Sequence, residues 1–410
     1  MKKILPVLIV IALLLPWVEA PGQSDSLRYS VRGVVRDADS GRPLQAVAVS
    51  LPGTSLAVIT NADGTFVIKS PQPASSLRFS LLGYRPLSQP VPASPSDVMR
   101  VRLQRESYTL DPASVMTGDP LTIMLMAIQR IAHNTPDEPE VFDCFYRETV
   151  QKRQRFIYVS EAVTKVYKAP ATGLFSRDRA AVVKSRLLTS PRASDTLGVK
   201  VQGGPAMAVN LDLVKTRGSV LSPDELQLYH LEMMLPELID MRMQFVIKLT
   251  PIADPGYALH NGVVYIDRET LAFTRIELSL DVSDPVLATN AMLVSRPPGL
   301  RFRPKELSLQ LNYKSEDGKT RLSYLRTVFR FNCDWRKKLF ATEFTTVAEM
   351  VVTNRHSGAE AVQIPRGESF GSRDILADKA EYYSDPDFWA AYNIIEPSVS
   401  LEHAINRLVK

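Results

Sequence analysis

The sequence predicts a mainly β protein: a small N-terminal β-sandwich, a connecting helix, a curved sheet of long antiparallel strands resembling a half-barrel, and a C-terminal helix. Residues 29–103 consist of short β-favouring runs separated by turn residues. Residues 141–352 alternate in hydrophobicity over longer runs joined by tight turns. The composition excludes a disordered or collagen-like chain, because 45% of the 410 residues are hydrophobic, 23% are charged, and the 19 glycines follow no fixed period.

Residues 1–22 have the pattern of a secretory signal peptide. Two lysines precede an apolar run over residues 4–18, and Ala20 and Gly22 place small residues three positions and one position before a cleavage at Gln23. A membrane anchor is the alternative, but the run falls short of the ~20 residues that span a bilayer and contains two prolines. We therefore expect export to the periplasm or the periphery of the outer membrane.

The rest of the chain suggests neither a membrane span nor a nucleic-acid partner. No later segment reaches 18 uninterrupted apolar residues, and no cysteine precedes Cys144 to carry a lipid anchor. The net charge is +5, and the densest basic groups, at 152–155 and 336–338, lie beside expected turns, where charged residues are usually solvated. Export makes a nucleic-acid partner less favoured still.

The expected sandwich occupies residues 23–105. The turn Asn61-Ala62-Asp63-Gly64 separates two β-favouring runs, and Gly64 can supply the positive φ that such a hairpin needs. The predicted strands cover residues 29–36, 45–51, 56–60, 65–69, 77–81 and 98–103. Strands at this spacing, with no helix between them, favour a small sandwich.

Three segments of this region also match a known family. They read GVVRDADSGRPLQAVAVSLPG from Gly33, TNADGTFVI from Thr60 and LRFSLLGYR from Leu77. The region resembles the carboxypeptidase-regulatory-like domain, and the resemblance implies a seven-stranded β-sandwich of the transthyretin type. The domain is found beside a peptidase, and its name implies no peptidase chemistry of its own.

The histidines argue against a zinc carboxypeptidase in the remainder. Such an enzyme needs a His-x-x-Glu pair and a distant third histidine, so that three protein ligands leave one position for water. No histidine has a glutamate three positions later, and no His-Glu-x-x-His occurs; the five are His133, His230, His260, His356 and His403. We therefore expect no metal and no cofactor.

Residues 106–139 are expected to form a connector and a helix, and residues 140–365 the curved β domain. Asp119 can cap a helix whose first residue is Pro120, and apolar residues follow at helical spacing over residues 121–132. Short helices are expected at 222–228 and 235–241. The predicted long strands are residues 141–151, 156–167, 181–189, 263–266, 272–280, 306–314, 320–332 and 339–352. Strands of this length must twist, which favours a strongly bent sheet.

Residues 366–410 form a tail that differs in composition. The aromatic, proline-bounded segments 385–389 and 392–397 precede a short helix ending at Leu408, which we expect to dock on the sheet. Together with the Phe-Tyr-Arg-Glu motif at 145–148, the whole layout resembles uncharacterised envelope proteins of Gram-negative anaerobes. Less specifically, the curved sheet resembles that of periplasmic lipoprotein carriers.

The two cysteines, Cys144 and Cys333, both lie in expected strands. An exported protein could join them in one disulfide, and two separate buried thiols are the alternative. Neither has a Cys-x-x-Cys partner, which excludes the usual zinc and redox patterns.

Two sets of residues are candidates for chemistry. Gly367-Glu368-Ser369-Phe370-Gly371 fits a nucleophile elbow, and Asp385 and His403 follow in the order of a serine hydrolase. The antiparallel surroundings and the short remaining chain favour an ordinary loop instead. Tyr146, Arg147 and Glu148 are the second set, in which alternation places Arg147 on the face opposite its two neighbours; an ordinary cross-strand ion pair is the simpler interpretation.

These observations favour a non-enzymatic envelope protein. In this hypothesis the sandwich is an interaction module, and the curved sheet holds an apolar ligand, a lipid tail or a segment of a partner protein. A serine hydrolase built on Ser369, Asp385 and His403 is the alternative. A purely structural attachment to the envelope differs from the first hypothesis only in having no ligand.

Overall fold

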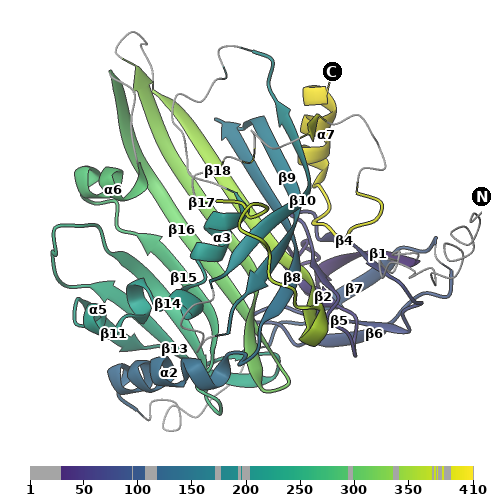
Figure 1. Ribbon diagram of the computed structural model, residues 1–410, viewed down its shortest axis with the longest axis horizontal. Helices are drawn as coiled ribbons and strands as arrows, with labels where there is room; N and C mark the ends of the chain where they lie inside the picture. The colour runs from purple at the N-terminus through teal and green to yellow at the C-terminus, as the bar shows by residue number, and fades with distance from the viewer. Residues whose placement is uncertain are drawn as a thin grey trace, which may run out of the picture.

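The computed structural model describes residues 29–94, 96–106, 118–170, 177–192, 195, 204–293, 299–335, 341–371, 374, 376, 381–382 and 389–409. The predicted signal peptide and Asp385 lie outside the described residues. The described residues form an N-terminal sandwich and a large curved sheet with helices (Figure 1).

The sandwich has seven strands in two sheets, as the family resemblance implies. The three-stranded sheet has the order β4-β1-β7 and the four-stranded sheet the order β3-β2-β5-β6. Their core is apolar, with Val35, Phe66 and Leu77 fully or almost fully buried. The strands are β1 (Tyr29–Asp37), β2 (Ala48–Ser50), β3 (Ala57–Ile59), β4 (Thr65–Ser70), β5 (Ser76–Ser80), β6 (Leu87–Pro90) and β7 (Met99–Leu103).

The second sheet has twelve strands and forms the body of the molecule. Along the path of hydrogen-bonded neighbours the order is β11-β13-β14-β15-β16-β17-β18-β8-β9-β10-β19, with β12 beside β13. Consecutive strands from β13 to β18 form an antiparallel meander, and β8 then joins the far side of β18. The strands are β8 (Glu140–Lys152), β9 (Arg155–Lys168), β10 (Arg179–Thr189), β11 (Tyr229–Met233), β12 (Glu237–Ile239), β13 (Arg242–Pro251), β14 (His260–Asp267), β15 (Phe273–Leu280), β16 (Leu300–Glu316), β17 (Lys319–Trp335), β18 (Thr342–Ser357) and β19 (Glu381–Tyr382).

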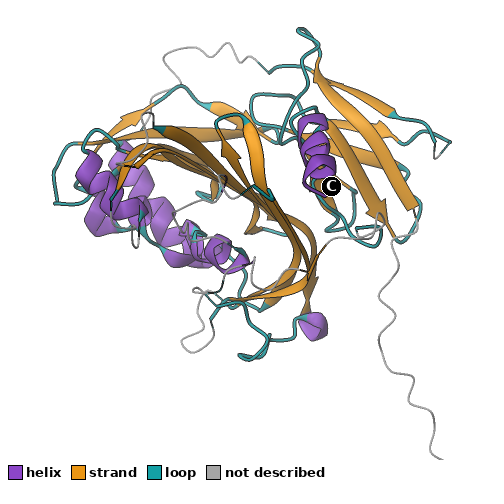
Figure 2. Ribbon diagram, turned by 90° about the horizontal axis from the view of Figure 1, so that it is seen from above, coloured by secondary structure: helices purple, strands orange, loops and turns teal. Residues whose placement is uncertain are grey.

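The large sheet is strongly curved, and helices lie against its concave side (Figure 2). The sandwich lies on the opposite, convex side. The α-helices are α2 (Pro120–Asn134), α3 (Pro205–Asn210), α4 (Leu213–Thr216), α5 (Pro223–Leu226), α6 (Pro285–Met292) and α7 (Val399–Val409). Two short 3-10 helices, η3 (Ser219–Leu221) and η4 (Gly358–Glu360), complete the described elements.

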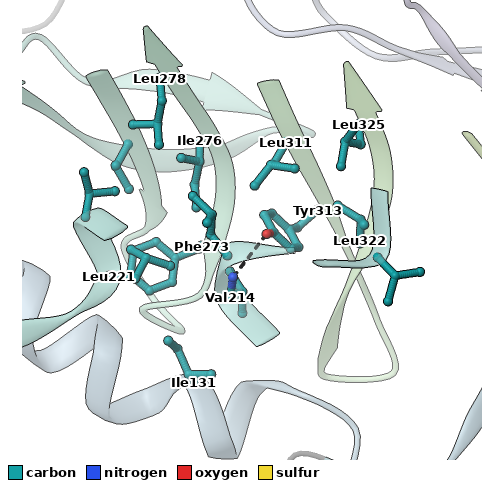
Figure 3. Close-up of a cluster of buried hydrophobic side chains, with 14 of the residues drawn as sticks. Ile131, Val214, Leu221, Phe273, Ile276, Leu278, Leu311, Tyr313, Leu322 and Leu325 are labelled. Carbon is teal, nitrogen blue, oxygen red and sulfur yellow. Dashed lines mark hydrogen bonds between the residues drawn. The ribbon is translucent and has the colours of Figure 1, made fainter. Parts of the chain in front are cut away.

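The main core lies between the concave face and helices α2 to α5. Ile131 of α2, Leu221 of η3 and Phe273 of β15 meet in it (Figure 3). The hydroxyl of Tyr313 accepts a hydrogen bond from Val214 N at 3.3 Å, which ties α4 to β16. Because helices fill this part of the concave side, the curvature of the sheet here encloses a packed core.

The convex side is joined to the sandwich through the C-terminal tail. Ile59 of β3, Phe145 of β8 and Ile395 of the tail belong to one buried cluster, together with Trp389. Figure 2 shows α7 between the sheet and the sandwich. The tail therefore docks on the sheet as predicted, with the sandwich on its other side.

Some local predictions are wrong. The expected helix at 235–241 is instead strand β12 followed by a turn, in which Asp240 and Met241 both have positive φ. Two strand pairs are parallel: β1 with β7 in the sandwich, and β10 with β19 in the curved sheet, which was expected to be antiparallel. The predicted start of α2 is confirmed, because the Asp119 side chain accepts a hydrogen bond from Thr122 N at 2.9 Å.

Candidate functional site

The candidate site is the middle of β8, where Tyr146, Arg147 and Glu148 follow one another. Successive side chains of a strand point to opposite faces. Tyr146 belongs to the core on the concave side, whereas the Arg147 side chain contacts the tail on the convex side. The three residues therefore belong to two separate sites, one on each face of the sheet.

On the concave face, Tyr146 is held by two hydrogen bonds. Its hydroxyl donates to Glu148 Oε2 at 3.0 Å and accepts from Gly204 N at 2.9 Å. Burial and the nearby Glu148 hold the pKa of Tyr146 well above its ordinary value, so the hydroxyl stays protonated and can donate. Burial also raises the pKa of Glu148. Tyr146 thus anchors the start of α3 to the sheet.

Buried hydroxyl groups surround Glu148 on the same face. Ser160 of β9 lies directly opposite Glu148, and Thr346 of β18 lies opposite Val150, two positions further along β8. Thr164 is opposite Cys144, in the other direction. The side-chain oxygens of these three residues are buried and have no hydrogen-bond partner among the described residues. A buried hydroxyl without a partner costs roughly 1–3 kcal/mol, so it calls for an explanation.

Beyond Thr346, the concave face becomes aromatic. Phe302, Phe329, Phe331 and Phe344 form a cluster with Val150, and adjacent ring centroids are 4.8–6.2 Å apart. Within the described part of the chain, α6 is the helix that contributes to this cluster, through Met292 at its end. The concave face therefore has one half under helices α2 to α5, one aromatic half, and polar groups between them.

On the convex face, Arg147 belongs to a buried group of charges. It donates to Glu161 Oε1 of β9 at 2.6 Å, and Arg186 Nε of β10 donates to Glu161 Oε2. Burial alone would raise the pKa of Glu161, but the two guanidinium groups outweigh it, so the pKa is lowered. All three side chains are at least 94% buried. Arg147 thus takes part in a cross-strand ion pair, with Glu161 and not with Glu148.

The same arginine connects the sheet to the tail, because its second nitrogen donates to the carbonyl of Ile395 at 2.6 Å. Lys69 of the sandwich donates to the carbonyls of Trp389 and Tyr392 at 2.8 and 2.9 Å. The sequence reasoning missed Glu161, although a charged residue inside the apolar run 156–167 was a usable signal. On the convex face of β8, the charged groups are therefore paired and join the strands to the tail. On the concave face, buried hydroxyl groups have no hydrogen-bond partner among the described residues.

The two cysteines are free, buried thiols, so the structure has the second of the two predicted alternatives. Cys144 pairs with Val352 and Cys333 with Thr342. These two partners lie roughly 30 Å apart along β18, at about 3.3 Å per residue. No disulfide can bridge that distance. Burial raises the pKa of Cys144 and raises that of Cys333 to about 11, so both are poor nucleophiles.

The structure does not bring Ser369 and His403 together. Phe370 follows Ser369, and its backbone N donates to the carbonyl of Ala180. Ala180 pairs with Val166, which lies near the C-terminal end of β9. His403 lies beside Phe156, which is near the N-terminal end of β9. The two ends are roughly 30 Å apart, and the Ser369 hydroxyl donates to the Arg366 carbonyl at 2.9 Å. A nucleophile and its base need hydrogen-bond distance, so the described part of the predicted triad is not assembled.

Among the described residues there is no group of three or more His, Cys, Asp or Glu side chains placed to hold a metal ion. In the same part of the chain, every helix is too short or too polar to cross a membrane.

Comparison with known proteins identifies the sandwich. Residues 31–115 match the model of the CarboxypepD_reg-like domain, which confirms the resemblance of this region. No curated protein matches the chain.

Several solved structures are weakly similar. A DUF1329 family protein from Desulfovibrio piger is 12% identical with a TM-score of 0.26, over 59% of this chain and 95% of its own. MucB, solved in complex with MucA(peri), is 13% identical with a TM-score of 0.19, over 59% of this chain and 100% of its own. A putative membrane-associated protein of unknown function from Bacteroides fragilis is 12% identical with a TM-score of 0.16, over 80% and 98%.

Proposed function

We propose that the protein is an exported, non-enzymatic binding or scaffold protein of the cell envelope. In this proposal the N-terminal sandwich is an interaction module, and the concave face of the curved sheet holds an amphipathic, lipid-like ligand. The signal-peptide pattern at residues 1–22 supports export, and the regulatory-type domain at 31–115 supports the interaction module.

The observation that carries the proposed ligand is the set of buried hydroxyls beside Glu148. Ser160 and Thr346 lie at the border between the helix-covered core and the aromatic cluster, and their oxygens have no partner among the described residues. Ligand sites are mostly apolar with a few well-placed polar groups. The apolar tail of such a ligand would pack against the phenylalanines, and its polar end would give the hydroxyls of Ser160 and Thr346 a hydrogen-bond partner.

The first experiment identifies the ligand class. The chain is purified from its own envelope and examined by native mass spectrometry, which should reveal a lipid that leaves on mild denaturation. A second experiment measures the affinity of the purified chain for a fluorescent fatty acid. Failure of the chain to bind any lipid in either experiment would contradict the proposal.

A variant pair locates the site. Ser160→Ala with Thr346→Val removes both hydroxyls at nearly constant volume, and it should weaken fatty-acid binding roughly thirtyfold, since each of the two lost hydrogen bonds is worth about 1 kcal/mol. The urea midpoint should stay the same or rise, because neither oxygen has a described partner. Thr345→Val is the matched control on the opposite face of the same strand. Equal losses in both variants would show that the hydroxyls are not the site.

A further inference from the structure

A second candidate site lies at the turn between β8 and β9, away from the concave face. The turn, the start of β18 and one face of α7 line an open pocket with a volume of about 710 Å³. This volume is within the range of ordinary ligand sites, roughly 300–1,000 Å³. Segments about 250 positions apart in the sequence therefore build one cavity.

The lining of the pocket is basic. Of the ten described residues that line it, four are Lys or Arg, one is His, three are neutral polar, and none is Asp or Glu. The ten are Lys152, Arg153, Gln154, Arg155, Phe156, Thr342, Ser400, His403, Ala404 and Arg407. A concave surface with one sign of charge attracts ligands of the opposite sign.

Nearby carboxylates neutralise only part of this charge. Asp195 accepts from Lys152 at 3.2 Å and from Arg155 at 2.7 Å. Arg153 and Arg407 make no ion pair with any residue in the described part of the chain. Two exposed guanidinium groups therefore remain available to a ligand.

The fold holds the backbone of both arginines in place. Arg153 has a φ of 58°, and its backbone N donates to the carbonyl of Glu343 at 2.8 Å, which fixes the turn against β18. Leu401 and Ile405 of α7 are buried against β9 and β10. Arg407 lies on the opposite side of that helix, on the same face as Ser400 and His403. The backbone positions that carry the two arginines are thus set before any ligand binds.

We infer that this pocket binds a phosphate group, free or carried by a lipid headgroup. Guanidinium groups match phosphate oxygens in paired hydrogen bonds, and the neutral hydroxyls of Thr342 and Ser400 supply further donors. The pocket is much larger than inorganic phosphate, which favours a phosphate attached to a larger molecule.

The test compares two double variants of the full mature chain. Arg153→Asn with Arg407→Gln removes the two available charges, and asparagine tolerates the left-handed backbone at 153. Arg32→Gln with Arg130→Gln is the control, because both arginines are exposed, have no described partner and lie on β1 and α2. Near-identical thermal midpoints establish that each variant folds.

Two probes distinguish the source of the phosphate. Inorganic phosphate is titrated by calorimetry, and vesicles of phosphatidylglycerol are compared with vesicles of phosphatidylcholine by flotation. We expect the wild type to bind at least one of the two anionic probes, the pocket variant to bind it at least tenfold more weakly, and the control variant to stay within twofold. Binding to neither probe, an unchanged pocket variant, or an equal loss in the control would overturn the inference.

Discussion

At the scale of single residues, the sheet buries charges where they compensate one another. Glu161 is fully buried, and it receives hydrogen bonds from Arg147 and Arg186 on the two neighbouring strands. A buried ion group of this kind adds little net stability, since the Coulomb attraction is offset by the loss of hydration. Removing one member is costly, however, because the others stay buried without compensation.

Glu161→Gln should therefore lower the free energy of unfolding by about 3–5 kcal/mol. The glutamine keeps the shape of the side chain but leaves two buried guanidinium groups without a counter-charge. Urea unfolding followed by circular dichroism measures the change. The control is Glu232→Gln, an exposed member of a surface pair, which should change stability by less than about 0.5 kcal/mol. A similar small loss for Glu161→Gln would mean that the two arginines reach water.

The ion pairs of His356 predict that the free energy of unfolding depends on pH near neutrality. Burial alone would lower the pKa of His356, but its contacts with Asp143 at 2.7 Å and Glu360 at 3.0 Å outweigh that effect, so the pKa is raised. A raised folded-state pKa adds stability below the unfolded pKa of about 6.5, and this stability is lost as the pH rises through the folded value.

The free energy of unfolding of the wild type should thus fall between pH 6 and pH 9 relative to that of His356→Gln. Urea titrations at intervals of one pH unit measure the difference. Parallel stability curves for the two proteins would contradict the assignment of this ion pair.

At the scale of elements, local sequence signals predict those elements whose boundaries depend on local chemistry. Asp119 caps α2 in the predicted way. Asp119→Ala should lower the free energy of unfolding by about 1 kcal/mol, because Thr122 N loses its acceptor. Asp119→Asn keeps an oxygen acceptor and should cost less. Equal losses in the two variants would show that the carboxylate charge, and not the hydrogen bond, is what stabilises this end of the helix.

Elements that depend on distant partners were predicted less well. Residues 235–241 have apolar residues at helical spacing, yet Glu237–Ile239 pair with β13, and the two following residues adopt positive φ. Strand β13 was missed although it alternates, and the short helices α3 and α4 have no strong signal of their own. Pairing across a sheet is a tertiary effect, and it overrides weak local preference.

The same limit applies to the candidate site. Alternation along β8 correctly separates Arg147 from Tyr146 and Glu148. The partners Glu161 and Ser160 depend on the register between β8 and β9, and the contact of Arg147 with Ile395 joins positions 248 residues apart. The order of Ser369 and His403 in the sequence suggested a site, but their contacts place them at opposite ends of β9. Sequence patterns thus identify faces, whereas assembled sites require the topology.

At the scale of the whole molecule, the C-terminal tail connects the sandwich to the sheet. Asn393 is central to this contact: its side chain accepts from Lys69 N at 2.7 Å and donates to the Lys69 carbonyl at 3.0 Å. Val399 N donates to Asp63 Oδ2 at 2.7 Å, and Ile394 and Ile395 are buried between the two parts. We therefore expect the sandwich and the sheet to unfold in one transition.

Asn393→Ala should separate that transition into two. The substitution removes both side-chain bonds to β4 and leaves the Lys69 backbone groups without these partners, while the cores of the sandwich and the sheet stay intact. Differential scanning calorimetry should show one peak for the wild type and two overlapping peaks for the variant, the sandwich melting first because it has the smaller core. Asn406→Ala, at an exposed position of α7, is the control and should keep one peak. A single unshifted peak for Asn393→Ala would mean that the contacts left in the variant, among them the buried Ile394 and Ile395 and the hydrogen bond from Val399 to Asp63, are enough to couple the two parts.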